Sequence, residues 1–143
     1  MSNPIQVPSV LNLSGQITSV LLVDPGDAPN TIISVNDSFT IKVAWSVSGT
    51  VLPYLGGEWV VRALVESIGQ GFEGQVGPTL TVPLNGTTSY NGNIVVPQGT
   101  INYPNPGADT VYKLVVLVSH RLFGVKTQIA GFGEGVYFEI QTP

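Results

Sequence analysis

The chain has 143 residues, no Cys and one His, and only 10% of its residues are charged. The lack of Cys excludes disulfides, zinc ribbons and thiol catalysis. Nine acidic and five basic residues give a net charge of −4, which argues against a nucleic-acid partner.

The N-terminal residues 1–14 are predicted to form an extended arm, separate from the rest of the chain. Two prolines exclude a helix there, and apolar Ile5 and Val7 favour contact with a neighbouring copy. The segment has no basic start and no apolar core, so we expect no signal peptide and synthesis in the cytoplasm. No apolar run approaches the ~18 residues of a membrane span, so we expect no membrane insertion.

Alternation of apolar and polar residues recurs along the rest of the chain, as in half-buried strands. It predicts seven main strands, at residues 15–23, 39–47, 58–66, 79–84, 89–96, 110–119 and 135–141. The abundance of Gly and Pro fits short strands joined by turns. Pro83 places the fourth strand at a sheet edge.

The strand at residues 39–47 alternates most clearly and defines the inward face of the predicted core. The predicted core residues are Phe39, Ile41, Val43, Trp45 and Tyr112. The strand at residues 110–119 is apolar on both faces, so it is buried on both faces or one face is an interface.

Seven strands separated by turns predict an all-β domain at residues 15–143, built as an antiparallel two-sheet sandwich. Trp45 in the second strand and the run Tyr112-Lys-Leu-Val-Val in the sixth resemble the immunoglobulin-like and fibronectin type III-like superfold. In that resemblance Tyr112 takes the tyrosine-corner position, and Trp59 competes with Trp45 for the core tryptophan. The superfold hosts many functions and implies none by itself.

The residues that could carry chemistry form no catalytic constellation. Residues 69–74 match G-x-G-x-x-G, but a strand follows where a dinucleotide site needs a helix. His120 has no nucleophile-elbow serine in the sequence and is expected at a strand end or an interface. A second glycine-rich run, residues 131–135, indicates close backbone packing. We therefore expect a protein that is not an enzyme.

Acidic residues in the loops raise the question of a metal site. Asp24 and Asp27 share a loop, and with Asp109 they offer oxygen ligands for a weak Ca²⁺ site. The same Asp-Pro-Gly-Asp pattern is an ordinary turn. We expect no cofactor and no assigned metal, and the sequence leaves Ca²⁺ at this loop open.

Two predicted connections are apolar, although connections are normally polar. The first contains Tyr54 and Leu55, and the second contains Phe123 and Phe132. In an immunoglobulin-like sandwich these connections emerge at the same end, so they would form one apolar patch. Alternatively, both fold back over the open end of the core. We predict that these four residues lie in a subunit interface.

The low charge content supports the same prediction, because soluble domains usually carry about 25% charged residues. A chain that covers its surface with copies of itself needs less charge to stay dispersed. We therefore predict a non-enzymatic structural protein that self-assembles through its apolar loops and arm, as a virion, phage-tail-like or filament subunit. Its expected partners are copies of itself and other structural proteins of such a particle.

The alternative is a monomeric β-sandwich binding module that recognises carbohydrate or protein through its loops. Three tyrosines, Tyr54, Tyr90 and Tyr103, offer aromatic faces on which sugars stack.

Overall fold

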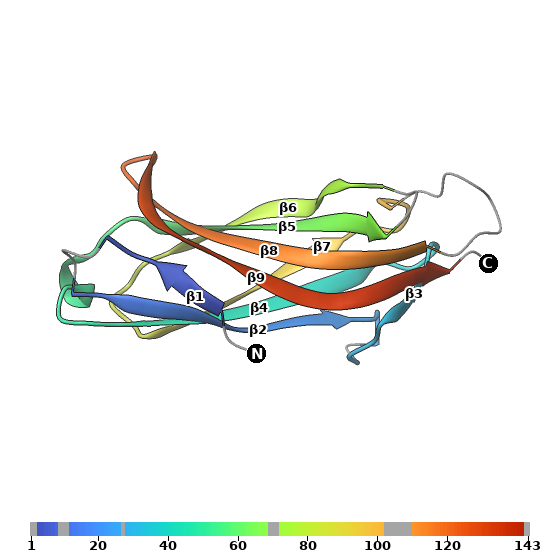
Figure 1. The fold of residues 1–143 in the computed structure, drawn as a ribbon, viewed down its shortest axis with the longest axis horizontal. Coiled ribbons are helices and arrows are strands. Elements are labelled where there is room, and N and C mark those ends of the chain that lie inside the picture. Colours follow the sequence, from blue (N-terminus) through green and yellow to red (C-terminus); the bar gives the residue numbers. More distant parts are fainter. Residues whose placement is uncertain (1–2, 9–11, 27, 69–71, 102–109, 142–143) are drawn as a thin grey trace.

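The computed structural model describes residues 3–8, 12–26, 28–68, 72–101 and 110–141. These residues form an all-β structure with one 3-10 turn, which confirms the prediction of an all-β chain (Figure 1). The elements are β1 (Asn3–Gln6), β2 (Ser14–Val23), β3 (Ile32–Ser34), β4 (Phe39–Ser48), η1 (Leu52–Tyr54), β5 (Glu58–Ile68), β6 (Gly74–Pro83), β7 (Ser89–Val96), β8 (Thr110–Leu122) and β9 (Val125–Gln141).

The strands follow one hydrogen-bonded order, β6-β5-β8-β9-β1-β2-β4-β7, and β3 lies beside β9. The neighbours in this order are antiparallel, but β3 pairs with β9 in parallel. The expectation of a purely antiparallel sheet is therefore wrong. The reason is directional: β2 and β9 are both antiparallel to β1, and the chain continues in the direction of β2 when it enters β3.

The strand β1 joins two parts of the sheet. Asn3 and Pro4 pair with β2, whereas Ile5 and Gln6 pair with β9. Ile5 is buried in the core of its own chain, and Val7 packs against that core. For Ile5 the expected contact with a neighbouring copy is therefore wrong, because its side chain is already covered by β2 and β9.

Glycines in β9 let β1 and β2 approach closely. A Cβ atom at Gly131 would lie 3.0 Å from the Ile5 Cα atom, and one at Gly133 would lie 3.2 Å from the Ile17 side chain. This glycine-rich segment thus serves close backbone packing, and it does so inside a strand rather than in a loop.

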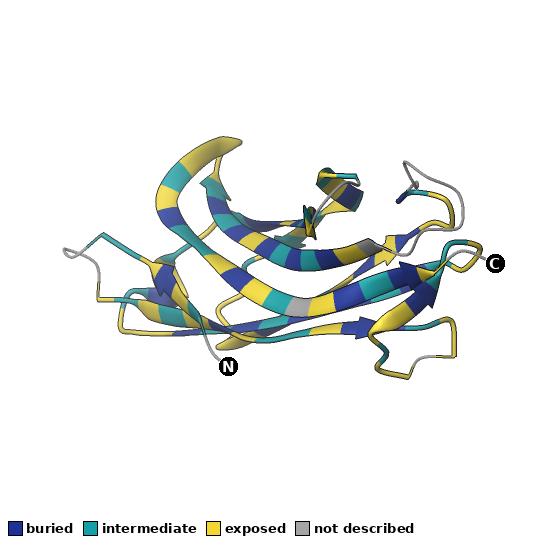
Figure 2. Cartoon of the chain, turned by 45° about the vertical axis from the view of Figure 1, so that its right-hand side comes forward, coloured by how far each residue is buried: buried dark blue, intermediate teal, exposed yellow. Residues whose placement is uncertain are grey.

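Buried and exposed residues alternate along the strands (Figure 2). The residues predicted for the core, Phe39, Ile41, Val43, Trp45 and Tyr112, are all buried. Trp45 on β4 and Trp59 on β5 meet edge to face with ring centroids 6.3 Å apart, although β4 and β5 are distant in the strand order. The sheet therefore curves around one core.

Candidate functional site

The β8–β9 hairpin carries the most exposed apolar side chain of the described residues, Phe123. The sequence predicted an apolar loop at this place. β8 extends to Leu122 and β9 begins at Val125, so only Phe123 and Gly124 make the turn. Their φ angles are 52° and 77°, as in the tight type I′ turn that fits the twist of paired strands. The predicted loop is thus a continuous hairpin, and Phe132 lies in a strand.

The end of this hairpin is strongly apolar. We call Leu122, Phe123 and Val125 the hairpin tip; all three are exposed, Phe123 to 95%. Tyr54 in η1 is 86% exposed, while Leu55 is partly buried against the core. η1, which contains Tyr54, and the β8–β9 turn lie at the same end of the molecule (Figure 1), as the sequence predicted for the two apolar connections.

A second apolar surface runs along the outer side of β5, β8 and β9. It consists of Ile68, Val111, Leu117, Phe132 and Tyr137, all exposed, and we call it the hairpin face. Phe132 is 56% exposed and lies directly opposite Leu117 in the register. The sequence analysis predicted only Phe132 of these five residues as an interface residue. The predicted strand at residues 110–119, which is apolar on both faces, already indicated that its outer side could be an interface.

The hairpin face carries charges of both signs, and one pair of them is bridged within the chain. Arg62 and Glu66 are exposed on β5 as the register partners of Leu117 and Lys113. The Lys113 ammonium donates to the Glu134 carboxylate at 2.9 Å, and this hydrogen bond raises the pKa of Lys113 above its ordinary value. The pair therefore presents little net charge to a molecule that covers the neighbouring Leu117 and Phe132.

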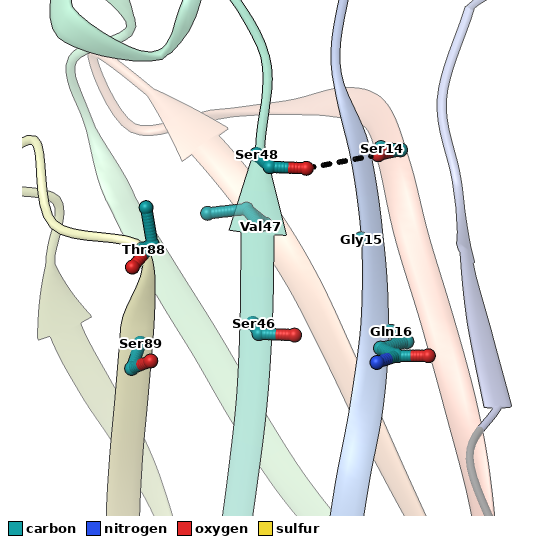
Figure 3. A pocket seen from close by; sticks show the side chains of 8 residues that line it. All are labelled: Ser14, Gly15, Gln16, Ser46, Val47, Ser48, Thr88 and Ser89. Atoms are coloured by element: carbon teal, nitrogen blue, oxygen red, sulfur yellow. Dashed lines mark hydrogen bonds between the residues drawn. The ribbon is translucent and has the colours of Figure 1, made fainter.

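The outer side of β2, β4 and β7 is polar by comparison. It carries an open depression of about 460 Å³ lined by Ser14, Gly15, Gln16, Ser46, Val47, Ser48, Thr88 and Ser89 (Figure 3). The hydroxyl groups of Ser14 and Ser48 lie 3.1 Å apart. The lining contains no charged or aromatic side chain, so it offers neither a charged acid or base nor a stacking platform.

His120 is fully buried and holds three parts of the chain together. Its Nε2 donates to the Gly56 carbonyl at 2.7 Å, and its Nδ1 lies 2.9 Å from the Thr127 hydroxyl. The ring also meets Trp59 edge to face, with centroids 5.6 Å apart. His120 thus links β8, β9 and the connection before β5, which is a structural role and not an interface contact.

We expect His120→Phe to lower the free energy of unfolding by about 1–3 kcal/mol, because the Gly56 carbonyl loses its buried donor. His120→Ala should cost more, since it also leaves a cavity beside Trp59. Urea unfolding of the two variants measures both effects. A Phe variant as stable as the wild type would show that the hydrogen bonds contribute nothing.

The acidic loop after β2 uses its carboxylate internally. Asp24 Oδ1 accepts from the amides of Gly26 and Ala28, and Asn30 donates to Oδ2. The hydrogen bond from Ala28, followed by those from Asn30 and Gly26, holds the pKa of Asp24 below its ordinary value despite slight desolvation. Asp27 and Asp109 lie outside the described residues. Among the described residues no three His, Asp or Glu side chains gather as a metal site.

The two described tyrosines of those expected to stack on sugars, Tyr54 and Tyr90, do not form a common platform. Tyr90 is buried and stacks on Trp45, with ring centroids 5.9 Å apart. Tyr103 lies outside the described residues, which leaves Tyr54 as the exposed member. The Tyr112 hydroxyl has no hydrogen-bond partner in the described part of the chain, so the hydrogen bond of a tyrosine corner is not seen there.

No helix in the described ranges is long and apolar enough to cross a membrane.

No protein-family model and no curated protein matches this chain. A crystal structure of β-glucosidase from Listeria innocua in complex with glucose aligns at TM-score 0.45 and 9% identity, covering 96% of this chain and 17% of that chain. A second crystal structure of β-glucosidase from Listeria innocua aligns at TM-score 0.44 and 9% identity with the same coverage. The chain thus spans 17% of the length of these enzyme chains, and likeness at this level carries no argument about activity.

Proposed function

We propose that this chain is a non-enzymatic structural subunit that assembles with copies of itself, and that the hairpin face is a main contact. The observation that carries the proposal is the concentration of exposed apolar side chains on one region. Twelve large hydrophobic residues are exposed in the described part of the chain. Eight of these lie on β5, β8, β9 and their turn, namely Ile68, Val111, Leu117, Leu122, Phe123, Val125, Phe132 and Tyr137.

A free surface of this kind is costly for a monomer. Burial of apolar surface contributes roughly 25 cal/mol per Å², so covering ~200 Å² contributes ~5 kcal/mol before the costs of association. The Lys113–Glu134 pair is neutralised within the chain, and the exposed Arg62 and Glu66 beside it carry opposite charges, so no single sign of charge dominates where two such faces meet. Large exposed apolar patches mark interaction sites for the same reason.

The fold proposed with this function is an immunoglobulin-like sandwich of two layers. β2, β4 and β7 would form one layer, and β5, β6, β8 and β9 the other, with β1 passing between the two. The contact between Trp45 and Trp59 across the core supports this division. The proposal covers subunits of virions, phage-tail-like particles and filaments alike, with other structural proteins of the same particle as further partners.

Sedimentation velocity of the wild type and two double variants tests the proposal. We expect the wild type to sediment well above its monomer mass of 15.1 kDa. Leu117→Asp/Phe132→Asp should sediment at a distinctly lower mass, because charges on the hairpin face would have to be desolvated on contact. The matched control, Asn91→Asp/Asn93→Asp, adds the same charge on exposed positions of β7 and should assemble like the wild type.

A wild type that remains at 15.1 kDa would contradict the proposal and favour the monomeric binding module. If the hairpin-face variant assembles as well as its control, the contact between copies lies on another surface. Circular dichroism of both variants confirms that each has kept its β-structure.

A further inference from the structure

We infer that copies of this chain also join head to tail, with the hairpin tip of one copy inserted into an apolar depression at the opposite end of the next. This inference rests on the proposed self-assembly and adds its polarity. The depression is lined by Leu21, Leu22, Pro29, Asn30 and Thr31, and we call it the socket.

The inserted group is Phe123 at the apex of the tip. A bulky residue with a positive φ angle is an outlier, because its Cβ atom crowds the backbone. Type I′ turns favour Asn, Asp and Gly at this place. At 95% exposure the Phe123 ring gains little from its own chain to offset this strain. Strained residues of this kind are typical of functional positions, and a projecting aromatic ring suits insertion into a partner.

The socket is of a suitable size and character to receive that ring. It is an open depression of about 250 Å³, which exceeds the roughly 150 Å³ of an enclosed apolar cavity that accommodates benzene. Leu21, on its wall, is 43% exposed. The Asn30 amide donates to the Leu22 carbonyl at 3.0 Å, so the rim is held by backbone hydrogen bonding.

The β8–β9 turn and the β2–β3 connection, which supplies Pro29, Asn30 and Thr31 to the socket, lie at opposite ends of the molecule (Figure 1). β9 begins at Val125 in the tip, and its Glu139 amide donates to the carbonyl of Thr31 in the socket at 2.8 Å. From residue 125 to residue 139 is 14 steps, or ~46 Å at ~3.3 Å per residue. A contact between two different surfaces at opposite ends is heterologous, so it extends into an open chain unless a rotation closes it.

The described charges at the two ends are complementary. Near the tip, Arg121 and Lys126 are register partners and Glu58 pairs with Arg121 at 3.0 Å, which leaves one positive charge in excess. The socket end carries Asp24 beside β2 and Glu139 beside Thr31. Two further acids, Asp37 and Glu73, lie in connections at that end, and Lys42 is the register partner of Leu21. The acids outnumber this cation, so attraction between unlike ends favours head-to-tail over head-to-head contact.

The experiment uses the Leu117→Asp/Phe132→Asp protein as its starting point, because its hairpin face should no longer bind a second copy and the tip–socket contact can be measured alone. We expect this protein to form concentration-dependent linear oligomers in sedimentation velocity. Phe123→Gly removes the inserted ring and should give monomers with an unchanged or higher Tm, because Gly tolerates the positive φ. Leu21→Arg blocks the socket with a bulky cation and should also give monomers.

The decisive measurement is sedimentation of a mixture of the two blocked variants. The Leu21→Arg protein keeps an intact tip and the Phe123→Gly protein keeps an intact socket, so the mixture should form a species of twice the monomer mass and stop there. A mixture that remains monomeric would overturn the inference, as would a Phe123→Gly protein that still elongates. A Leu117→Asp/Phe132→Asp protein that forms no oligomers would also overturn the inference. If the wild type still assembles in that case, the proposed function stands.

Discussion

Replacing Trp45 by alanine is expected to lower the free energy of unfolding by about 3–5 kcal/mol, since it removes a large side chain from a closely packed core. Trp45 is 1% exposed and stacks on Tyr90. It also meets Trp59 edge to face, so its loss opens a cavity where the two sides of the sheet meet. Urea unfolding at neutral pH measures the change through the transition midpoint.

The matched control for Trp45 is Val95→Ala on the neighbouring strand β7, where the side chain is exposed. We expect this variant to unfold within about 0.5 kcal/mol of the wild type. A Trp45→Ala protein equally close to the wild type would show that the inward face of β4 has been assigned to the wrong side.

Deleting residues 1–8 is expected to destabilise the fold by roughly 3 kcal/mol or more, through loss of Ile5 burial and of the β1 backbone pairing. The strand lies between β2 and β9, so its removal leaves both edges without a neighbour at Gln16 and Gly131. Thermal unfolding of the truncated chain measures the effect. This outcome is the opposite of that expected for a separate arm, whose loss would leave the domain as stable as before.

Two point variants separate the role of β1 from a general effect of truncation. Ile5→Asp puts a charge into the core, whereas Gln6→Asp changes an exposed residue of the same strand. We expect the first to approach the instability of the truncated chain and the second to resemble the wild type. If the wild type, the truncated chain and the two point variants are equally stable, residues 1–14 are a separable arm after all.

The β8–β9 hairpin shows a limit of reading turns from residue type. Leu122-Phe123-Gly124-Val125 lacks the Asn-Gly or Asp-Gly pair that usually identifies a type I′ turn. The long register that runs from Leu122↔Val125 to Thr110↔Ile140 nevertheless forces the chain to reverse within two residues. Pairing over the whole hairpin thus overrides the local preference at Phe123, and the ring is left in solvent.

The sequence by itself determined the strand character and the inward faces, because alternation with a period of two is a local property of each segment. It therefore identified Phe39, Ile41, Val43 and Trp45 as core residues and Pro83 as part of an edge strand, β6. Only the tertiary structure decided which strands are neighbours: β1 between β2 and β9, β3 parallel to β9, and His120 bonded to Gly56. These choices depend on contacts between residues far apart in the chain, where glycines such as Gly131 leave room and buried polar groups need partners. No local pattern encodes them.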